Sequence, residues 1–134
     1  MIYFPDVSRW QGDINFDVMR TKTDYIIFKA SQGDFTDKKL SRNIAESKRV
    51  GLPYGLYHFY DDTFSPSVQA ETFAGLANGA VELWCDWEST YGGEYETLRD
   101  VVAFMERVEK LTGKRVGMYT GYYWFVDNSY PTMN

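Results

Sequence analysis

Five short runs rich in β-branched and aromatic residues recur along the chain, and each gap between them is long enough for a helix or a helical turn. Strands that alternate with helical segments predict right-handed βαβ units, which build a parallel sheet. We therefore expect an α/β fold in which residues 1–134 form a single domain. The expected strands are 2–5, 25–30, 54–60, 81–86 and 115–120.

The gaps carry residues that typically begin and end helices. Asn, Asp, Ser and Thr are favoured at N-caps because their side chains accept a hydrogen bond from a free backbone N–H of the first turn. Glycine commonly follows the last turn. The third helix is expected to extend as far as Ala77, where its apolar stripe ends. The expected N-caps are Asn15, Asp37, Ser65 and Thr97, and the expected stops are Gly51 and Gly113.

Charge and hydropathy exclude two classes of partner. The formal net charge is −5 and the pI is near 4.8, whereas nucleic-acid phosphates require a basic face. No apolar run approaches the roughly 18 residues of a membrane-spanning helix. The first expected strand begins so early that it leaves no room for the apolar core of a secretory signal. We expect no nucleic-acid partner, no membrane span, and release by another route.

Cys85 and His58 are the single residues of their kinds. One cysteine excludes an internal disulfide, and the sequence lacks the Cys/His spacing of a zinc site. We therefore expect no metal and no cofactor. Cys85 is expected to be a buried apolar residue, and His58 to support neighbouring groups rather than to act as a base.

Acidic side chains fall at the ends of the expected strands. In parallel α/β folds the carboxyl ends of the strands lie on one side, and this side carries the functional site. Asp6 follows the first strand, and Asp86 and Glu88 end the fourth. Residues two apart in a strand point to the same face, so Asp86 and Glu88 are predicted to act as an acid/base pair. Alternatively, the strand ends at Trp84 and both acids are solvated loop charges.

Several motifs, in one order and spread over the whole chain, resemble glycoside hydrolase family 25, the Chalaropsis-type lysozymes. The resemblance implies an incomplete parallel β/α barrel that cleaves the β-1,4 bond between N-acetylmuramic acid and N-acetylglucosamine in bacterial peptidoglycan. It also implies catalytic roles for Asp6, Asp86 and Glu88. The motifs are DVSRWQGDINF at 6–16, FKASQG at 28–33, NIAESKRVGLPYGLYHF at 43–59, QAETF at 69–73, WCDWE at 84–88 and GMYTGYYW at 117–124.

The expected chemistry assigns a separate role to each acid. Glu88 is predicted to protonate the leaving oxygen, with a pKa raised by burial or by a neighbouring anion. Asp86 is predicted either to stabilise the oxocarbenium-like transition state or to orient the 2-acetamido group of the substrate for attack on the anomeric carbon. Asp6 is predicted to hold a carboxylate or a sugar hydroxyl, or else to cap the following turn. The sequence leaves retention and inversion both open.

Other residues are candidates for binding the saccharide. Aromatic residues make up 18% of the chain, and such rings stack on sugars or fill a core. Lys29 lies in an apolar strand and is expected to pair with Asp6 or Asp86. Gln32 replaces the Glu that is more usual in the resembled family. The expected substrate-binding residues are Lys29, Tyr57, Tyr119, Trp10 and Trp84.

The number of strands sets a further expectation. A closed β/α barrel has eight strands, so five suggest that the C-terminal part of a catalytic domain is missing. Residues 1–134 alone are then expected to self-associate or to need a complementing C-terminal segment. A phage endolysin that reaches the cell wall through a holin is favoured over a secreted autolysin. The alternative to an enzyme is a non-catalytic saccharide-binding fragment on the same fold.

Overall fold

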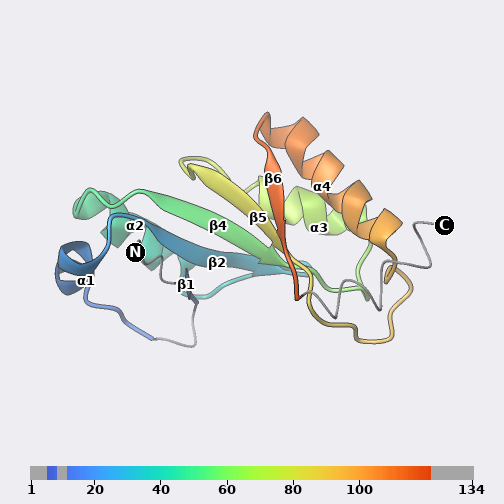
Figure 1. Ribbon diagram of the computed structural model, residues 1–134, viewed down its shortest axis with the longest axis horizontal. Helices are drawn as coiled ribbons and strands as arrows, with labels where there is room; N and C mark the ends of the chain where they lie inside the picture. Colours follow the sequence, from blue (N-terminus) through green and yellow to red (C-terminus); the bar gives the residue numbers. More distant parts are fainter. Residues whose placement is uncertain (1–5, 9–11, 122–134) are drawn as a thin grey trace.

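The computed structural model describes residues 6–8 and 12–121, and in this part of the chain the fold is a parallel sheet with helical connections (Figure 1). The strand order is β1-β2-β4-β5-β6, with every neighbouring pair parallel, while β3 pairs antiparallel with β2. The expected α/β class and its five parallel strands are confirmed. The strands are β1 (Asp6–Val7), β2 (Ile26–Gln32), β3 (Phe35–Thr36), β4 (Tyr54–Phe59), β5 (Glu82–Asp86) and β6 (Val116–Tyr119).

The helices occupy the gaps between the parallel strands. Because the strand order follows the chain order without a reversal, right-handed crossovers place α2, α3 and α4 on the same face of the sheet. Figure 1 shows α3 and α4 side by side, close to β5 and β6. The helices are α1 (Phe16–Lys22), α2 (Leu40–Arg49), α3 (Pro66–Ala74) and α4 (Leu98–Thr112).

The strand register separates a core face from an open face. Phe28, Leu56, Leu83 and Val116 lie in one row across four strands, and all are buried on the side of the helices. The next row holds Lys29, Tyr57, Trp84 and Gly117, which point to the opposite face and are only partly buried. Lys29, Tyr57 and Trp84 therefore lie on a face of the sheet that α2, α3 and α4 do not cover, which we call the open face.

A glycine lets the largest ring of the open face lie flat on the sheet. The indole of Trp84 covers Gly117 so closely that a Cβ at Gly117 would be 2.5 Å from the Cζ3 atom of Trp84. Real Cβ contacts are never that short, so any other residue at position 117 has to displace the indole.

Three of the four expected N-caps are confirmed. Asn15 accepts from the Val18 N–H at 3.2 Å, Ser65 accepts from the Val68 N–H at 3.2 Å, and Thr97 forms a capping box with Asp100. Gly51 and Gly113 follow the second and fourth helices, both with positive φ.

Asp37 is not an N-cap, so this prediction is wrong. Its own N–H donates to the Ala30 carbonyl at 2.9 Å, which keeps Asp37 beside β2, and the helix begins only at Leu40. The carboxylate of Asp37 instead accepts from the Lys39 N–H at 3.0 Å. The expected extent of the third helix is also wrong, because α3 ends at Ala74 and Ala77 lies in the turn that follows.

β3 was not expected from the sequence. This strand forms a tight hairpin with the end of β2, in which Gln32 lies opposite Phe35. Gly33 turns the chain with a φ of +55°, and a Cβ there would meet the ring of Phe64, so the hairpin rests on that ring. The expected first strand, 2–5, lies outside the described residues, and β1 begins at Asp6.

Candidate active site

The candidate site lies at the carboxyl end of the open face. The register aligns one row of residues from β3 across to β6, so their side chains share the face that carries Lys29, Tyr57 and Trp84. The carboxyl ends of parallel strands meet at this edge, as expected from the sequence. The row consists of Phe35, Gln32, Phe59, Asp86 and Tyr119.

Asp86 is the last residue of β5, and both neighbouring strands fix its position. Its carbonyl accepts a hydrogen bond from the Tyr60 N–H at 2.9 Å, and the next N–H, of Trp87, donates to the Tyr119 carbonyl at 2.9 Å. The residue is 8% exposed, so its carboxylate is largely shielded from water. The backbone of Asp86 is thus fixed at a strand end and its carboxylate is withdrawn from water, which suits a group that must contact a substrate accurately.

Glu88 follows Asp86 by two residues but lies in a different environment. Trp87 between them is 1% exposed and belongs to the core, whereas the Glu88 side chain is exposed. β5 ends at Asp86, so the alternative in which the strand ends at Trp84 and both acids are solvated loop charges is wrong for Asp86. It is right for Glu88, which follows the strand as an exposed loop residue, so the strand alternation that predicted a shared face for the two acids does not reach Glu88. Of the two causes expected to raise the pKa of the proton donor, burial is wrong, because the chain has already left the sheet at Glu88 and the side chain is exposed, while a neighbouring anion stays a prediction.

The loop that carries Glu88 is held by Asp62, a residue that the sequence analysis missed. The buried carboxylate of Asp62 accepts hydrogen bonds from the Tyr91 N–H at 3.0 Å and from the Thr90 hydroxyl, and the Asp62 carbonyl accepts from the Tyr95 N–H at 2.9 Å. The Tyr60 hydroxyl donates to the Tyr95 carbonyl at 2.8 Å. The β4–α3 loop therefore fixes the chain between β5 and α4.

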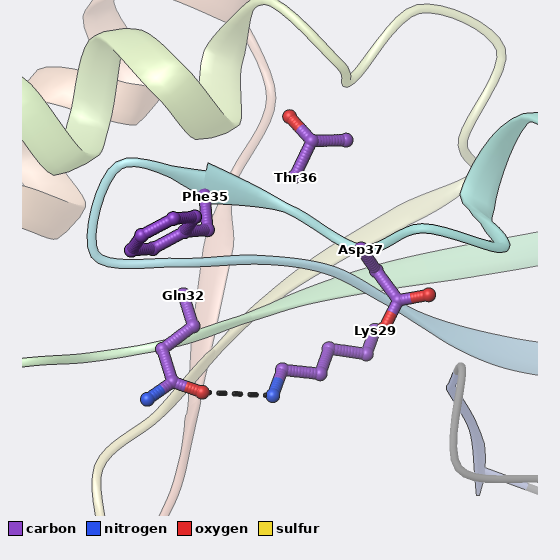
Figure 2. A pocket seen from close by; sticks show the side chains of 5 residues that line it. All are labelled: Lys29, Gln32, Phe35, Thr36 and Asp37. Atoms are coloured by element: carbon purple, nitrogen blue, oxygen red, sulfur yellow. Dashed lines mark hydrogen bonds between the residues drawn. The ribbon is translucent and has the colours of Figure 1, made fainter.

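Lys29 and Gln32 line a hollow beside the hairpin, as Figure 2 shows. The Lys29 ammonium donates to the Gln32 Oε1 at 2.9 Å and lies 5.3 Å from the centroid of the Phe59 ring, within cation–π range. The hollow measures about 250 Å³, and its lining is completed by Phe35, Thr36 and Asp37. The predicted pairing of Lys29 with Asp6 or Asp86 stays a prediction. The side chain of Asp6 lies outside the described residues.

The sequence matches a known family over nearly its whole length. A model of the family described as Glycosyl hydrolases family 25 matches residues 5–134. The chain belongs to this family. Family 25 membership agrees with the resemblance that the sequence motifs carry, and it places the row of Asp86 in an enzyme family whose members hydrolyse glycosidic bonds.

Individual proteins are similar to this chain at modest identity. The uncharacterized protein YegX of Escherichia coli K12 is 31% identical over 134 residues, covering 92% of this chain and 49% of YegX. Two solved structures share the fold. The lysozyme from Streptomyces coelicolor has a TM-score of 0.79 at 28% identity, with 91% and 64% of the two chains covered. The catalytic domain of endolysin ply40 from Listeria monocytogenes bacteriophage P40 has a TM-score of 0.78 at 22% identity, with 96% and 67% covered. The chain thus spans about half of its curated relative.

The structure describes some of the other predicted site residues fully, one by its backbone alone, and one not at all. Tyr57 lies between Lys29 and Trp84 on the open face, and Tyr119 is 62% exposed at the end of the Asp86 row. Asp6 has its backbone in β1, but its side chain lies outside the described residues. Trp10 is also outside them.

Trp84 is fixed by a polar contact as well as by Gly117. Its indole N–H donates to the Glu82 Oε2 at 3.2 Å, and the Tyr25 hydroxyl donates to the same oxygen at 3.1 Å. Burial, together with the Glu82 charge, raises the pKa of Tyr25. These contacts hold the indole in one orientation, so any sugar contact of Trp84 would be made by a rigid ring.

His58 has a structural role, in agreement with the expectation that it is not a base. Its Nε2 lies 2.8 Å from the Gln69 Oε1 and its Nδ1 lies 2.7 Å from the Ser31 hydroxyl. The Gln69 Oε1 also accepts from the Asp61 N–H, so the Nε2–H tautomer of His58 satisfies all three groups. The ring stacks on Phe104 of α4, and burial lowers the pKa of His58 to about 4.

The described part of the chain contains neither a metal-binding cluster nor a membrane-spanning helix. Across residues 6–8 and 12–121, no group of three or more His, Cys, Asp or Glu side chains is arranged to hold a metal ion. Within the same residues, no helix has both the length and the apolar character needed to cross a membrane. Cys85 is buried, as expected, and burial raises the pKa of its thiol.

Proposed function

We propose that the protein is a muramidase that hydrolyses the β-1,4 bond between N-acetylmuramic acid and N-acetylglucosamine in bacterial peptidoglycan. One observation carries the proposal. In a family 25 chain, the buried Asp86 carboxylate ends an interior strand, and the exposed Glu88 carboxylate follows two residues later. The similarity to a Streptomyces coelicolor lysozyme supports the same substrate class.

In the proposed reaction Glu88 is the general acid. A glycosidic oxygen is a poor leaving group, so it needs a proton as its bond to the anomeric carbon breaks. Glu88 lies at the start of a loop that Asp62 holds in place, which keeps the proton donor near the strand end while its exposed side chain remains accessible to a polymer. Water then supplies the hydroxyl group at the anomeric carbon and returns a proton to Glu88.

Asp86 is proposed to act on the 2-acetamido group of the sugar. A fixed, shielded carboxylate accepts the acetamido N–H and thereby orients the carbonyl oxygen toward the anomeric carbon. Attack by this oxygen forms a cyclic oxazolinium intermediate, which water opens with overall retention. In the competing route Asp86 stabilises the positive charge while water attacks directly, with inversion.

The test is the release of reducing ends from purified peptidoglycan. Glu88→Gln should keep the fold and saccharide binding but lower turnover by on the order of 10²-fold or more, as expected for the loss of a general acid. Glu94→Gln, on an exposed residue of the same loop, is the matched control and should be unaffected. Turnover of Glu88→Gln within a few-fold of the parent would refute the assignment, and a parent that binds wall but releases no reducing ends would favour a non-catalytic saccharide-binding module.

Two expectations about the biological setting stay predictions. The first is a phage endolysin that reaches the cell wall after release through a holin. The second is self-association, or completion by a C-terminal segment, of residues 1–134. Light scattering tests the second expectation by measuring the molar mass of the purified chain, alone and in the presence of the C-terminal segment of a longer family 25 protein.

A further inference from the structure

The hairpin formed by β2 and β3 places an exposed aromatic ring at one end of the Asp86 row. Phe35 lies directly opposite Gln32, and Gln32 is followed across the sheet by Phe59 and then by Asp86. Residues that pair in this way point to the same face. Phe35 therefore shares the open face with Asp86, although the sequence indicated no role for it.

The exposure of Phe35 does not result from a loose hairpin. The side chain is 69% exposed, yet the turn beside it rests on the ring of Phe64 through Gly33. The N–H of Asp37 donates to the Ala30 carbonyl at 2.9 Å and closes the other end of the hairpin. A single exposed apolar residue needs no explanation in itself, but an exposed ring on a fixed backbone beside a hollow is placed where a ligand in the hollow can contact it.

The hollow next to Phe35 offers hydrogen-bond donors. Lys29 donates to the Gln32 Oε1 at 2.9 Å, and this bond fixes the amide so that its NH₂ group is turned away from Lys29, as Figure 2 shows. The volume of about 250 Å³ lies below the range of roughly 300–1,000 Å³ typical of sites for drug-sized ligands, so it fits one sugar unit and not an oligosaccharide. A ring face beside amide donors suits a pyranose with an acetamido or hydroxyl oxygen.

The distance from Asp86 separates this hollow from the bond that is cleaved. Phe35 is three strands away from Asp86 in the row, which corresponds to about 14 Å at the usual spacing of about 4.8 Å between strands. A glycan chain that crosses the carboxyl edge of the sheet would therefore reach Phe35 with a sugar unit remote from the scissile bond.

We propose that Phe35 and Gln32 form a distal subsite for an N-acetylhexosamine unit of the glycan, in which the Phe35 ring stacks on the pyranose face and the Gln32 amide donates to a sugar oxygen. The proposal rests on the proposed muramidase function, which supplies the glycan. The contact is the same in the ground state and the transition state, because it is made away from the reacting atoms. It contributes to binding and not to the chemical step.

The first test measures binding of N-acetylglucosamine oligomers by calorimetry, which needs no turnover and uses a probe without peptide or carboxylate. Phe35→Ala should weaken binding on the order of 5- to 10-fold, the effect of losing one aromatic contact of about 1 kcal/mol or slightly more. Phe35→Trp should restore binding, since it keeps a ring at the same position. Val102→Ala, which truncates an exposed residue of α4, is the matched control.

The second test separates this subsite from the muramidase proposal. On purified peptidoglycan, Phe35→Ala should raise KM by a similar factor and leave kcat unchanged, while a short substrate that cannot reach the hairpin should show no change. Ring-dependent oligomer binding with no release of reducing ends would support the subsite and refute the muramidase. Oligomer affinity of Phe35→Ala within twofold of the parent would overturn the subsite, whether or not the protein cleaves wall.

Discussion

The buried carboxylate of Asp62 accepts a hydrogen bond from the backbone N–H of Tyr91 at 3.0 Å, and this bond joins two loops that are 29 positions apart in the sequence. The same carboxylate accepts from the Thr90 hydroxyl. Because the Tyr91 loop begins at the end of β5, Asp62 connects the β4–α3 loop to the chain that carries Glu88. The position of the proposed general acid thus depends on a residue from another βα unit.

Replacement of Asp62 should loosen this loop. Asp62→Ala leaves the Tyr91 N–H and the Thr90 hydroxyl without their acceptor, and we expect the free energy of unfolding to fall by about 2–3 kcal/mol. Asp62→Asn keeps one acceptor oxygen and should cost less. Chemical denaturation measures both changes.

Kinetics distinguish a role of Asp62 in positioning Glu88 from a role in stability alone. If Asp62 positions Glu88, kcat should fall in Asp62→Asn under conditions where the variant remains fully folded, and KM should change little. Glu94→Ala, in the same loop, should change neither stability nor kcat. An unchanged kcat in a folded Asp62→Asn variant would show that the loop contact does not serve Glu88.

His58 should make the protein sensitive to mild acid. Burial lowers its pKa from about 6.5 in the unfolded chain to about 4, so between these values the unfolded state binds the proton and the folded state does not. The contribution of His58 to the free energy of unfolding is therefore fully present above about pH 6.5. It is lost as the pH drops toward 4, by up to about 3 kcal/mol at 1.36 kcal/mol per pKa unit.

A variant isolates this pH dependence from that of the carboxylates. Ion pairs with Arg and Lys side chains lower the pKa values of Asp13, Asp17 and Glu46, so the effects of these groups appear mainly below about pH 4.5. In His58→Gln the slope of stability between pH 6.5 and 4.5 should disappear, whatever the absolute stability. Denaturation midpoints measured across this range provide the readout, and a parent protein with a flat profile there would contradict the prediction.

Gly117 should tolerate no side chain while Trp84 is in place. Gly117→Ala puts a Cβ 2.5 Å from the indole, which has to move and lose its bond to Glu82, and we expect a loss of about 1–3 kcal/mol. Gly75→Ala is the control, because a Cβ there meets atoms no closer than 3.4 Å and the φ is −63°. In a double-mutant cycle, the cost of Gly117→Ala should largely vanish in a Trp84→Leu background.

The parallel sheet was predictable because its signals are local. Runs such as 54–60 are long, apolar and bounded by turn residues, and capping residues such as Ser65 act within one helical turn. Asp37 shows where a local rule fails. The residue has the right type for an N-cap, but its backbone N–H is engaged by Ala30, seven positions earlier.

The parts of the site that the sequence did not reveal depend on long-range contacts. The D-x-E spacing made Asp86 and Glu88 candidates, yet it gave no indication that Asp86 is buried and Glu88 exposed, since that follows from where β5 ends. Nothing near Asp62 in the sequence points to Tyr91. The Gly33–Asp34 pair, in contrast, is a local signal for a two-residue hairpin loop and could have predicted the hairpin that carries Phe35.

The role of Asp86 can be decided with a modified substrate. If the 2-acetamido group attacks the anomeric carbon, peptidoglycan whose muramic acid lacks the N-acetyl group cannot react by that route, and the parent protein should fail to cleave it. Direct attack by water needs no acetamido group, so the same substrate should then lose only part of its binding. Reducing-end release from intact and de-N-acetylated wall measures the difference.

The anomeric configuration of the product is a second, independent test of the role of Asp86. Acetamido attack followed by opening with water retains the anomeric configuration, whereas direct attack by water inverts it, and NMR of the first-formed product distinguishes them. Asp86→Asn should lower turnover on intact wall by on the order of 10²-fold, because an amide neither carries the charge nor accepts with both oxygens. Rapid cleavage of the de-N-acetylated wall with inversion would reject the acetamido-orienting role and leave Asp86 as an electrostatic stabiliser or as the base that activates water.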